Sequence, residues 1–223
     1  MADFNTKQLR NLALLGHGGS GKTSLAEAML FIAGATDRLG SIAGSNTVCD
    51  YDAEEKARGF TLSATPAFMT WKDTKINVLD TPGFLDFQGE VKQAVRVADA
   101  AVICVDGKAG VEVGTELAWD AACAAGIPKA FFINKCDDPE TKFARVFHQI
   151  HATFGGELTM IICGGAALSQ NIFRLTAPLP APDIGDDAVG AEIVAAVHDG
   201  NPGLQLGVPD LGDALGDGAG FVF

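Results

Sequence analysis

Short apolar runs alternate with longer stretches of helical period along the first 175 residues. Apolar runs of strand length occur at 11–15, 75–79, 100–105, 129–134 and 159–163. Runs of this kind are typical of strands that are buried on both faces of a sheet. Helices are expected at about 21–33, 88–98, 114–126 and 143–150. The alternation predicts an α/β fold with a mostly parallel central sheet and helices on both faces.

The clearest helical pattern lies between the last two apolar runs. Its apolar residues are spaced i, i+3, i+4 and i+7 and share one helix face: Phe143, Val146, Phe147 and Ile150. The stretch at 60–71 alternates apolar and polar residues, and a short turn separates it from the run at 75–79. This stretch predicts a further strand at an antiparallel edge of the sheet.

Two segments depart from the alternation. Residues 34–59 form a long connection rich in Gly, Ser, Asn and charged residues, a length that is typical of mobile or functional loops. Residues 176–223 contain nine Gly, five Pro and no basic residue, and only 191–198 resembles a helix. We therefore expect one domain at 1–175, followed by an irregular, disordered or loosely packed tail at 176–223.

Composition and charge narrow the class of protein. The net charge is -12, and all 16 Lys and Arg residues lie at or before Arg174, so capture of nucleic acid by bulk charge is not supported. No apolar run approaches the roughly 20 residues of a membrane span, and the N-terminus lacks a signal-type segment. The five Cys include no CxxC pair, which disfavours a disulfide framework or a zinc site. We expect a soluble, cytoplasmic protein with no DNA or membrane partner.

A phosphate-binding motif follows the first apolar run. In the sequence GHGGSGKTS, Gly16, Gly21, Lys22 and Thr23 fit the phosphate-loop pattern between a strand and a helix. Glycines there turn backbone N–H groups toward phosphate oxygens, and the helix N-terminus adds its positive end. Lys22 would reach the outer phosphates and the Thr23 hydroxyl would bind Mg²⁺, so the motif predicts a nucleoside triphosphate. The alternative is a glycine-rich turn that only caps a helix, and His17 is expected to pack rather than to catalyse.

A second group of candidate residues surrounds the run at 75–79. Asp80 follows this run directly, so its carboxylate would lie beside the phosphate loop, where it can hold a water ligand of Mg²⁺. Gly83 can bring its N–H close to a terminal phosphate because it has no side chain. Thr61 is the candidate for a second hydroxyl on Mg²⁺, held while the terminal phosphate is bound. An ordinary turn and a strand threonine are the alternative interpretations.

The sequence NKCD at 134–137 closes the run at 129–134 and predicts the base. Asp137 can accept two hydrogen bonds from guanine, whereas the lone pair of adenine N1 would face it unfavourably. Lys135 can lie along the ring, and Asn134 can tie this loop to the phosphate loop. Cys136 occupies the variable position, and nothing nearby favours a redox role for its thiol.

With these motifs in order, residues 1–175 resemble the GTP-binding domain of translational GTPases, and most closely that of elongation factor G and its paralogues. The resemblance rests on RNLALLGHGGSGKTSLAEAML, NTVCDYDAEEKARGFTL and LDTPGFLDFQGEVKQAVRVADAAVICVDG. It implies a P-loop NTPase fold and a cytoplasmic, monomeric GTPase that acts on the ribosome. It also implies Mg²⁺ as cofactor, a loop at 34–61 that changes between GTP and GDP states, and a guanine contact at Gly165 and Ala166.

The chain departs from this family in several places. Phe84 stands where most members have the histidine that orients the attacking water, although elongation factor G paralogues often have an aromatic residue there. Gly19 stands where an aspartate is usual. From the resemblance we expect that the chain lacks the family's inserted subdomain after residue 156 and its later domains, while GAGFVF at 218–223 resembles the first strand of the family's β-barrel domain.

These considerations give one set of expected site residues and three hypotheses. Nucleotide contacts are expected from Gly16, His17, Gly18, Gly19, Ser20, Gly21, Lys22, Thr23, Ser24, Asp80, Thr81, Pro82, Gly83, Phe84, Asn134, Lys135, Cys136, Asp137, Gly165 and Ala166. Catalysis is expected from Lys22, Thr61 and Gly83, and Mg²⁺ binding from Thr23, Thr61 and Asp80. The first hypothesis is a GTPase with slow hydrolysis that a partner stimulates. The second is a truncated, non-hydrolysing GTP- or ribosome-binding protein, and the third, an ATP-dependent phosphotransferase, is disfavoured by Asp137.

Overall fold

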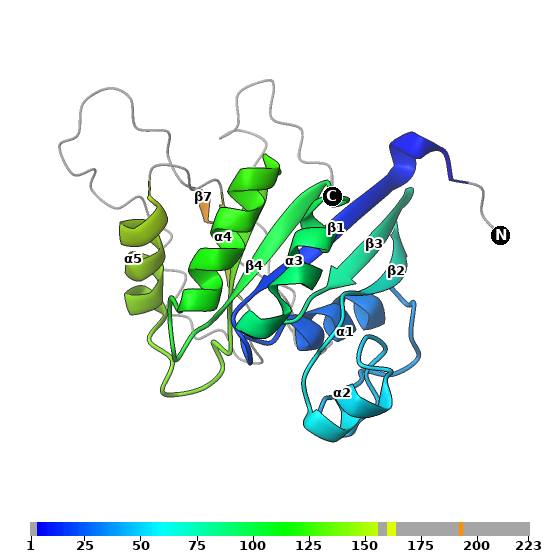
Figure 1. Ribbon diagram of the computed structural model, residues 1–223, viewed down its shortest axis with the longest axis horizontal. Helices are drawn as coiled ribbons and strands as arrows, with labels where there is room; N and C mark the ends of the chain where they lie inside the picture. Colours follow the sequence, from blue (N-terminus) through cyan, green and yellow to red (C-terminus); the bar gives the residue numbers. More distant parts are fainter. Residues whose placement is uncertain (1–3, 156–159, 164–191, 194–223) are drawn as a thin grey trace, which may run out of the picture.

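The computed structural model describes residues 4–155, 160–163 and 192–193. The strands are β1 (Leu9–Gly16), β2 (Thr65–Trp71), β3 (Thr74–Asp80), β4 (Ala100–Asp106), β5 (Lys129–Asn134), β6 (Met160–Cys163) and β7 (Glu192–Ile193). The helices are α1 (Lys22–Ile32), α2 (Ala53–Arg58), α3 (Gln88–Val95), α4 (Val113–Ala125) and α5 (Phe143–Phe154), with short 3-10 turns at Thr6–Gln8 and Leu85–Phe87. Strands and helices therefore alternate as the apolar pattern predicts (Figure 1).

The strands form one sheet in the order β2-β3-β1-β4-β5-β6-β7. Only β2 and β3 pair antiparallel, and the other neighbours are parallel. In the register of the parallel strands, Leu14 pairs with Asp80 and Asp106 pairs with Asn134. The carboxyl ends of β1, β3, β4 and β5 therefore meet at one edge, where ligands of open α/β sheets bind.

Alternate residues of the strands face two hydrophobic cores. On one face, Leu15 and Ile103 pack in a core with Val91 of α3, Trp119 of α4 and Ile150 of α5. On the other face, the core contains these residues of the sheet and α1: Leu14, Met69, Val78, Leu25 and Leu30. Figure 1 shows α3 and α4 in front of β1 and β4. Both faces are covered, which explains why the strand sequences are apolar almost throughout.

The structure confirms the predicted fold class, including the antiparallel edge at β2, but it differs in two places. Helix α2 lies inside the connection at 34–59, where no helix was expected. The sequence at 191–198 resembles a helix, and a helix is wrong for Glu192–Ile193. These two residues form β7 and pair in parallel with β6. The unpaired backbone at the edge of β6 provides these hydrogen bonds. The rest of the tail at 176–223 lies outside the described residues.

Within the described part of the chain, none of the helices is long and apolar enough to cross a membrane.

Candidate functional site

The loop between β1 and α1 wraps around the ammonium group of Lys22. The Lys22 side chain is buried, and its Nζ donates hydrogen bonds to the carbonyl oxygens of Gly16 at 3.1 Å and His17 at 2.8 Å. Gly21 directly precedes α1 and has φ 90°, in the left-handed region that glycine tolerates best. Burial lowers the pKa of Lys22, while the nearby Asp80 carboxylate opposes this effect. The ammonium group of Lys22 is therefore held across the loop by backbone oxygens.

Gly83 approaches the same loop so closely that a side chain would not fit. A Cβ atom at this position would lie 2.5 Å from Lys22 Nζ and 2.6 Å from Gly18 N. The segment is anchored by Thr81, whose Oγ1 donates to Leu14 O at 2.6 Å, and by the buried Pro82. Its backbone thus lies against the residues that the sequence assigns to phosphate binding.

Four polar side chains lie in a row beside Lys22, and each of the two hydroxyls among them donates its proton to a carboxylate. Thr23 Oγ1 donates to Asp80 Oδ2 at 2.7 Å and lies 3.1 Å from Thr61 Oγ1. Thr61 Oγ1 in turn donates to Asp50 Oδ1 at 2.8 Å. The three residues expected to bind Mg²⁺ therefore lie together, although Thr61 is far from the other two in sequence. Asp50 was not expected, because an isolated acid in a long loop gives no signal that it contacts Thr61.

The surroundings of Asp80 test whether a cation fits here. Its side chain is 0% exposed, and within the described residues its Oδ1 atom has no hydrogen-bond partner. Burial raises the pKa of Asp80 to about 7, although the hydrogen bond from Thr23 and the charge of Lys22 oppose this shift. Among the described residues, no three His, Cys, Asp or Glu side chains form a metal cluster. One orphaned carboxylate oxygen with two hydroxyls nevertheless suits a Mg²⁺ ion that takes its remaining ligands from phosphates and water.

Buried carboxylates dock the long connection at 34–61 against the domain. Glu27 of α1 accepts hydrogen bonds from Gly40 N at 3.0 Å and Val48 N at 2.5 Å. Glu55 of α2 accepts from Leu62 N at 2.9 Å, just beyond Thr61. The connection is thus held to α1 at Gly40 and Val48, and the residue after Thr61 is held by Glu55.

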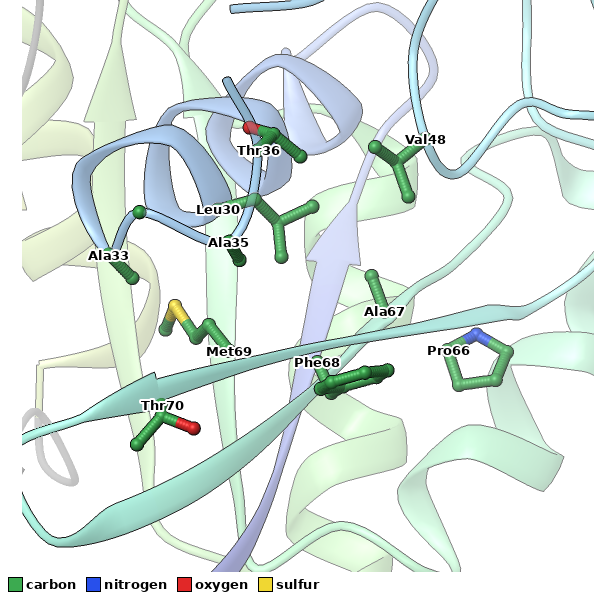
Figure 2. Close-up of a pocket in the computed structure, with 11 residues that line it drawn as sticks. Leu30, Ala33, Ala35, Thr36, Val48, Pro66, Ala67, Phe68, Met69 and Thr70 are labelled. Carbon is green, nitrogen blue, oxygen red and sulfur yellow. The ribbon is translucent and has the colours of Figure 1, made fainter. Parts of the chain in front are cut away.

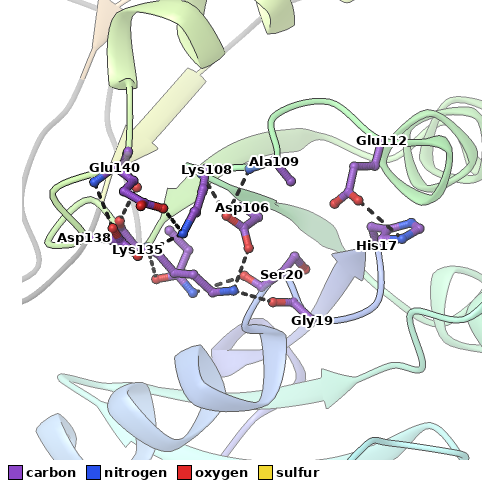
Figure 3. Close-up of polar contacts among 12 residues, drawn as sticks. His17, Gly19, Ser20, Asp106, Lys108, Ala109, Glu112, Lys135, Asp138 and Glu140 are labelled. Carbon is purple, nitrogen blue, oxygen red and sulfur yellow. Dashed lines mark hydrogen bonds and ion pairs between the residues drawn. The ribbon is translucent and has the colours of Figure 1, made fainter.

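Asn134 and Lys135 join the end of β5 to the phosphate loop, and Figure 3 shows Lys135 beside Gly19. Asn134 Nδ2 donates to Ser20 O at 3.1 Å, and Lys135 Nζ donates to Gly19 O at 2.9 Å. Lys135 has φ 58°, an unusual conformation for a residue with a side chain. Asp137 is exposed at this edge, which leaves its carboxylate accessible to a base.

The remaining expected residues are arranged as follows. Ser20 Oγ is buried without a hydrogen-bond partner in the described part of the chain, whereas Ser24 is exposed. Cys136 Sγ donates to Ile133 O at 3.3 Å. Gly165 and Ala166 lie outside the described residues, so their expected contact with guanine stays a prediction.

Aromatic rings lie over the phosphate loop at the position where the family usually has histidine. The Phe84 ring is 4.6 Å from the Phe60 ring between centroids and is 43% exposed. A Cβ atom added at Gly18 would lie 3.2 Å from Phe84, so the ring contacts the loop. Phe84 has no hydrogen-bonding group with which to orient water.

His17 connects the phosphate loop to the start of α4. Its Nδ1 accepts a hydrogen bond from Gly114 N at 3.2 Å, and its Nε2 lies 3.5 Å from Glu112 Oε1. The side chain therefore points toward Glu112 (Figure 3). This geometry suits packing rather than a chemical step.

A hollow of about 390 Å³ lies away from this edge, between α1 and β2. Figure 2 shows Leu30, Ala67 and Met69 around it, and no charged side chain belongs to its lining. The groups that can carry phosphate chemistry are thus at the carboxyl ends of the strands.

Comparisons with known proteins agree with this geometry. The profile of the elongation factor Tu GTP binding domain matches residues 7–201. The chain is 41% identical over 140 residues to a protein named ribosome-releasing factor 2, mitochondrial, from Drosophila melanogaster, covering 63% of this chain and 19% of that protein. It is 40% identical over 136 residues to the protein of the same name from Schizosaccharomyces pombe, covering 61% of this chain and 17% of that protein.

One solved structure has a similar fold. The chain resembles a crystal structure of a protein from Thermus thermophilus with a TM-score of 0.66 and 34% identity, covering 73% of this chain and 24% of that one. The chain spans about a fifth of the length of the two curated relatives. The profile covers well over half of the chain and includes every described site residue from Gly16 to Asp137. The chain therefore belongs to the family of elongation factor Tu GTP-binding domains, as the sequence motifs predicted, and its fold is that of a P-loop NTPase.

Proposed function

We propose that this domain binds GTP and GDP together with Mg²⁺ and hydrolyses GTP as a conformational switch. The observation that carries the proposal is the group of contacts around Asp80. There a buried carboxylate with an orphaned oxygen lies beside two hydroxyls and the ammonium group of Lys22. Such a cluster costs stability in the absence of ligands, which favours a binding role over a structural one.

Each group would have a definite role toward the nucleotide. Backbone N–H groups between Gly16 and Thr23 would bind the phosphates, and Lys22 would balance their negative charge. Thr23, Thr61 and Asp80 would hold Mg²⁺, directly or through water. When bound, Mg²⁺ neutralises charge that develops on the phosphate oxygens. Asp137, with Lys135 beside it, would select guanine.

Hydrolysis would depend on positioning, because the ring of Phe84 has no hydrogen-bonding group to direct the attacking water. Gly83 N–H and Lys22 Nζ would stabilise charge on the terminal phosphate. The exposed Phe84 ring beside Phe60 would instead limit access of water to this corner. We therefore propose a slow intrinsic reaction that a partner accelerates. The same ring motivates the second candidate, a domain that binds GTP without cleaving it.

The ribosome is the partner that we propose, since the two curated relatives described above are named ribosome-releasing factors. The chain matches less than a quarter of either relative, so the proposal concerns recognition by the GTP-binding domain and not release. A monomer in the cytoplasm was expected from the sequence and remains a prediction, and both relatives are named as mitochondrial.

A competition experiment tests the choice of base. Nucleotide-free protein is incubated with fluorescent GDP and Mg²⁺, and unlabelled GTP, ATP and XTP are titrated against it. GTP is expected to compete at least roughly tenfold better than ATP, and Asp137→Asn should weaken GTP and favour XTP because the exocyclic oxygen of xanthine can accept from the new amide. Equal competition by GTP and ATP, or an unchanged preference in the variant, would refute the guanine assignment.

A further inference from the structure

Asp106, the last residue of β4, makes contacts that the nucleotide-binding motifs do not include. One carboxylate oxygen, Oδ1, accepts hydrogen bonds from Lys108 N at 2.8 Å and Ala109 N at 3.3 Å. The other, Oδ2, accepts from Lys135 Nζ at 2.5 Å. The Asp106 side chain is 15% exposed and the Lys135 side chain is 44% exposed, so solvent screens this ion pair in part. Figure 3 shows the carboxylate between the β4–α4 loop and Lys135.

The ammonium group of Lys135 is thus held between two acceptors, one at the end of β4 and one in the phosphate loop. One is Asp106 Oδ2 and the other is Gly19 O of the phosphate loop, 2.9 Å away. At the other end of the residue, the backbone is fixed by a hydrogen bond from Thr141 Oγ1 to Lys135 O at 2.7 Å. With both ends fixed, the apolar stem of Lys135 has little freedom.

The charge of Asp106 reflects the same arrangement. Burial by itself raises the pKa of this carboxyl, but the hydrogen bonds from Lys135, Lys108 N and Ala109 N outweigh burial and lower the pKa below its ordinary value. The carboxylate is therefore ionised at neutral pH and attracts the Lys135 ammonium group.

From these contacts we infer that Asp106 is a positioning residue for nucleotide retention, which acts by holding the Lys135 stem against the base. This inference rests on the proposed function, because it requires that a guanine base lies along Lys135. Asp106 itself does not contact the nucleotide. Its loss should leave the preference for guanine intact, because Asp137 provides that preference, and should shorten the lifetime of the complex.

The substitution Asp106→Asn separates the two contacts of this side chain. The amide oxygen can still accept from Lys108 N and Ala109 N, so the turn is kept, while the amide nitrogen is a donor that faces the Lys135 ammonium group. Release of fluorescent GDP, measured by stopped flow with excess unlabelled GDP, should be roughly five- to tenfold faster than in the wild type. The ratio of GTP to ATP affinity should not change.

Lys135→Met supplies the second half of the test, since methionine keeps an apolar stem without the ammonium group. In this background Asp106→Asn should have no further effect on the release rate, because the two residues act through one contact. The matched control is Glu140→Gln, which removes the exposed ion pair between Glu140 and Lys108 in the same region and should leave release unchanged.

A measurement without nucleotide shows whether the contact forms in solution. Carboxyl carbon NMR of the nucleotide-free protein should give Asp106 a pKa that rises when Lys135 is replaced by Met. An unchanged pKa would overturn the inference, as would wild-type release from Asp106→Asn or additive effects in the double variant. If the wild-type protein retains no GDP at all, the proposed function fails as well, and the two failures are thereby distinguished.

Discussion

Replacement of Asp80 by asparagine should stabilise the nucleotide-free protein while it damages nucleotide binding. The carboxylate is fully buried, and burial is the main reason that its pKa rises from the ordinary 3.8 to about 7. At about 1.4 kcal/mol for each tenfold change in proton affinity, this difference is about 4 kcal/mol against the ionised form in the folded protein. This free-energy difference already includes the favourable contacts of Asp80 with Thr23 and Lys22.

The sign of the pH dependence follows from the raised pKa. The unfolded chain loses the Asp80 proton near pH 4, whereas the folded protein keeps it until about pH 7. The stabilising contribution is therefore complete below about pH 4, is lost as the pH rises to about 7, and stays lost above that. Asparagine does not ionise. The variant and the wild type should therefore have the same free energy of unfolding at low pH, and that of the variant should be higher by up to about 4 kcal/mol at pH 8.

Urea denaturation of nucleotide-free protein in EDTA measures this difference. Tryptophan fluorescence reports unfolding, because Trp119 is buried against Phe131 in the folded protein, whereas Trp71 is exposed. With Mg²⁺ and GTP the wild type should instead be more stable than Asp80→Asn, because only the wild type gains the full stabilisation by ligand. For the nucleotide-free comparison Asp137→Asn is the matched control, since it makes the same chemical change at an exposed acid and should leave the stability of the nucleotide-free protein unchanged. A variant less stable than the wild type at pH 8, or a difference that is independent of pH, would refute the reasoning.

Three further substitutions test other parts of the site. Gly83→Ala places a Cβ about 2.5 Å from Lys22 Nζ and should lower GTP affinity at least roughly tenfold by calorimetry, and wild-type affinity would contradict the tight approach. Glu27→Gln removes one of two buried acceptors for the loop at 40–48 and should destabilise the fold by about 1–3 kcal/mol, with faster hydrogen exchange at Val48 as the readout. Phe84→His supplies a polar group beside the loop and should accelerate single-turnover hydrolysis at least roughly tenfold; an unchanged rate would show that residue 84 does not limit the reaction.

The fold could be predicted from the sequence because its determinants are local. The apolar runs match strands that are covered on both faces, and the motif at Gly16–Thr23 fixes the order of strand, loop and helix. Helix α2 escaped prediction because it is only six residues long and mostly charged. It is stabilised by capping from Asp52 and by the contact of Glu55 with Leu62 N, neither of which gives a hydrophobic period.

Only those site residues that belong to sequence motifs could be predicted. Those motifs identified Thr23, Asp80 and Lys135, but Asp50 and Asp106 belong to the site through contacts with residues that are distant in sequence. Asp50 reaches Thr61 only because the connection at 34–61 folds back against α1. Pairing of this kind depends on the tertiary arrangement, which no single spacing in the sequence encodes.

Single-turnover incubation tests the central claim most directly. Nucleotide-free protein is mixed with a substoichiometric amount of GTP and Mg²⁺, with and without ribosomes, and the bound nucleotide is extracted and quantified over time. The account predicts that GTP is retained, that it is converted slowly to GDP, and that ribosomes accelerate the conversion. Retention of uncleaved GTP in both conditions would support the non-hydrolysing alternative, and the absence of any bound nucleotide would contradict the assignment of the site.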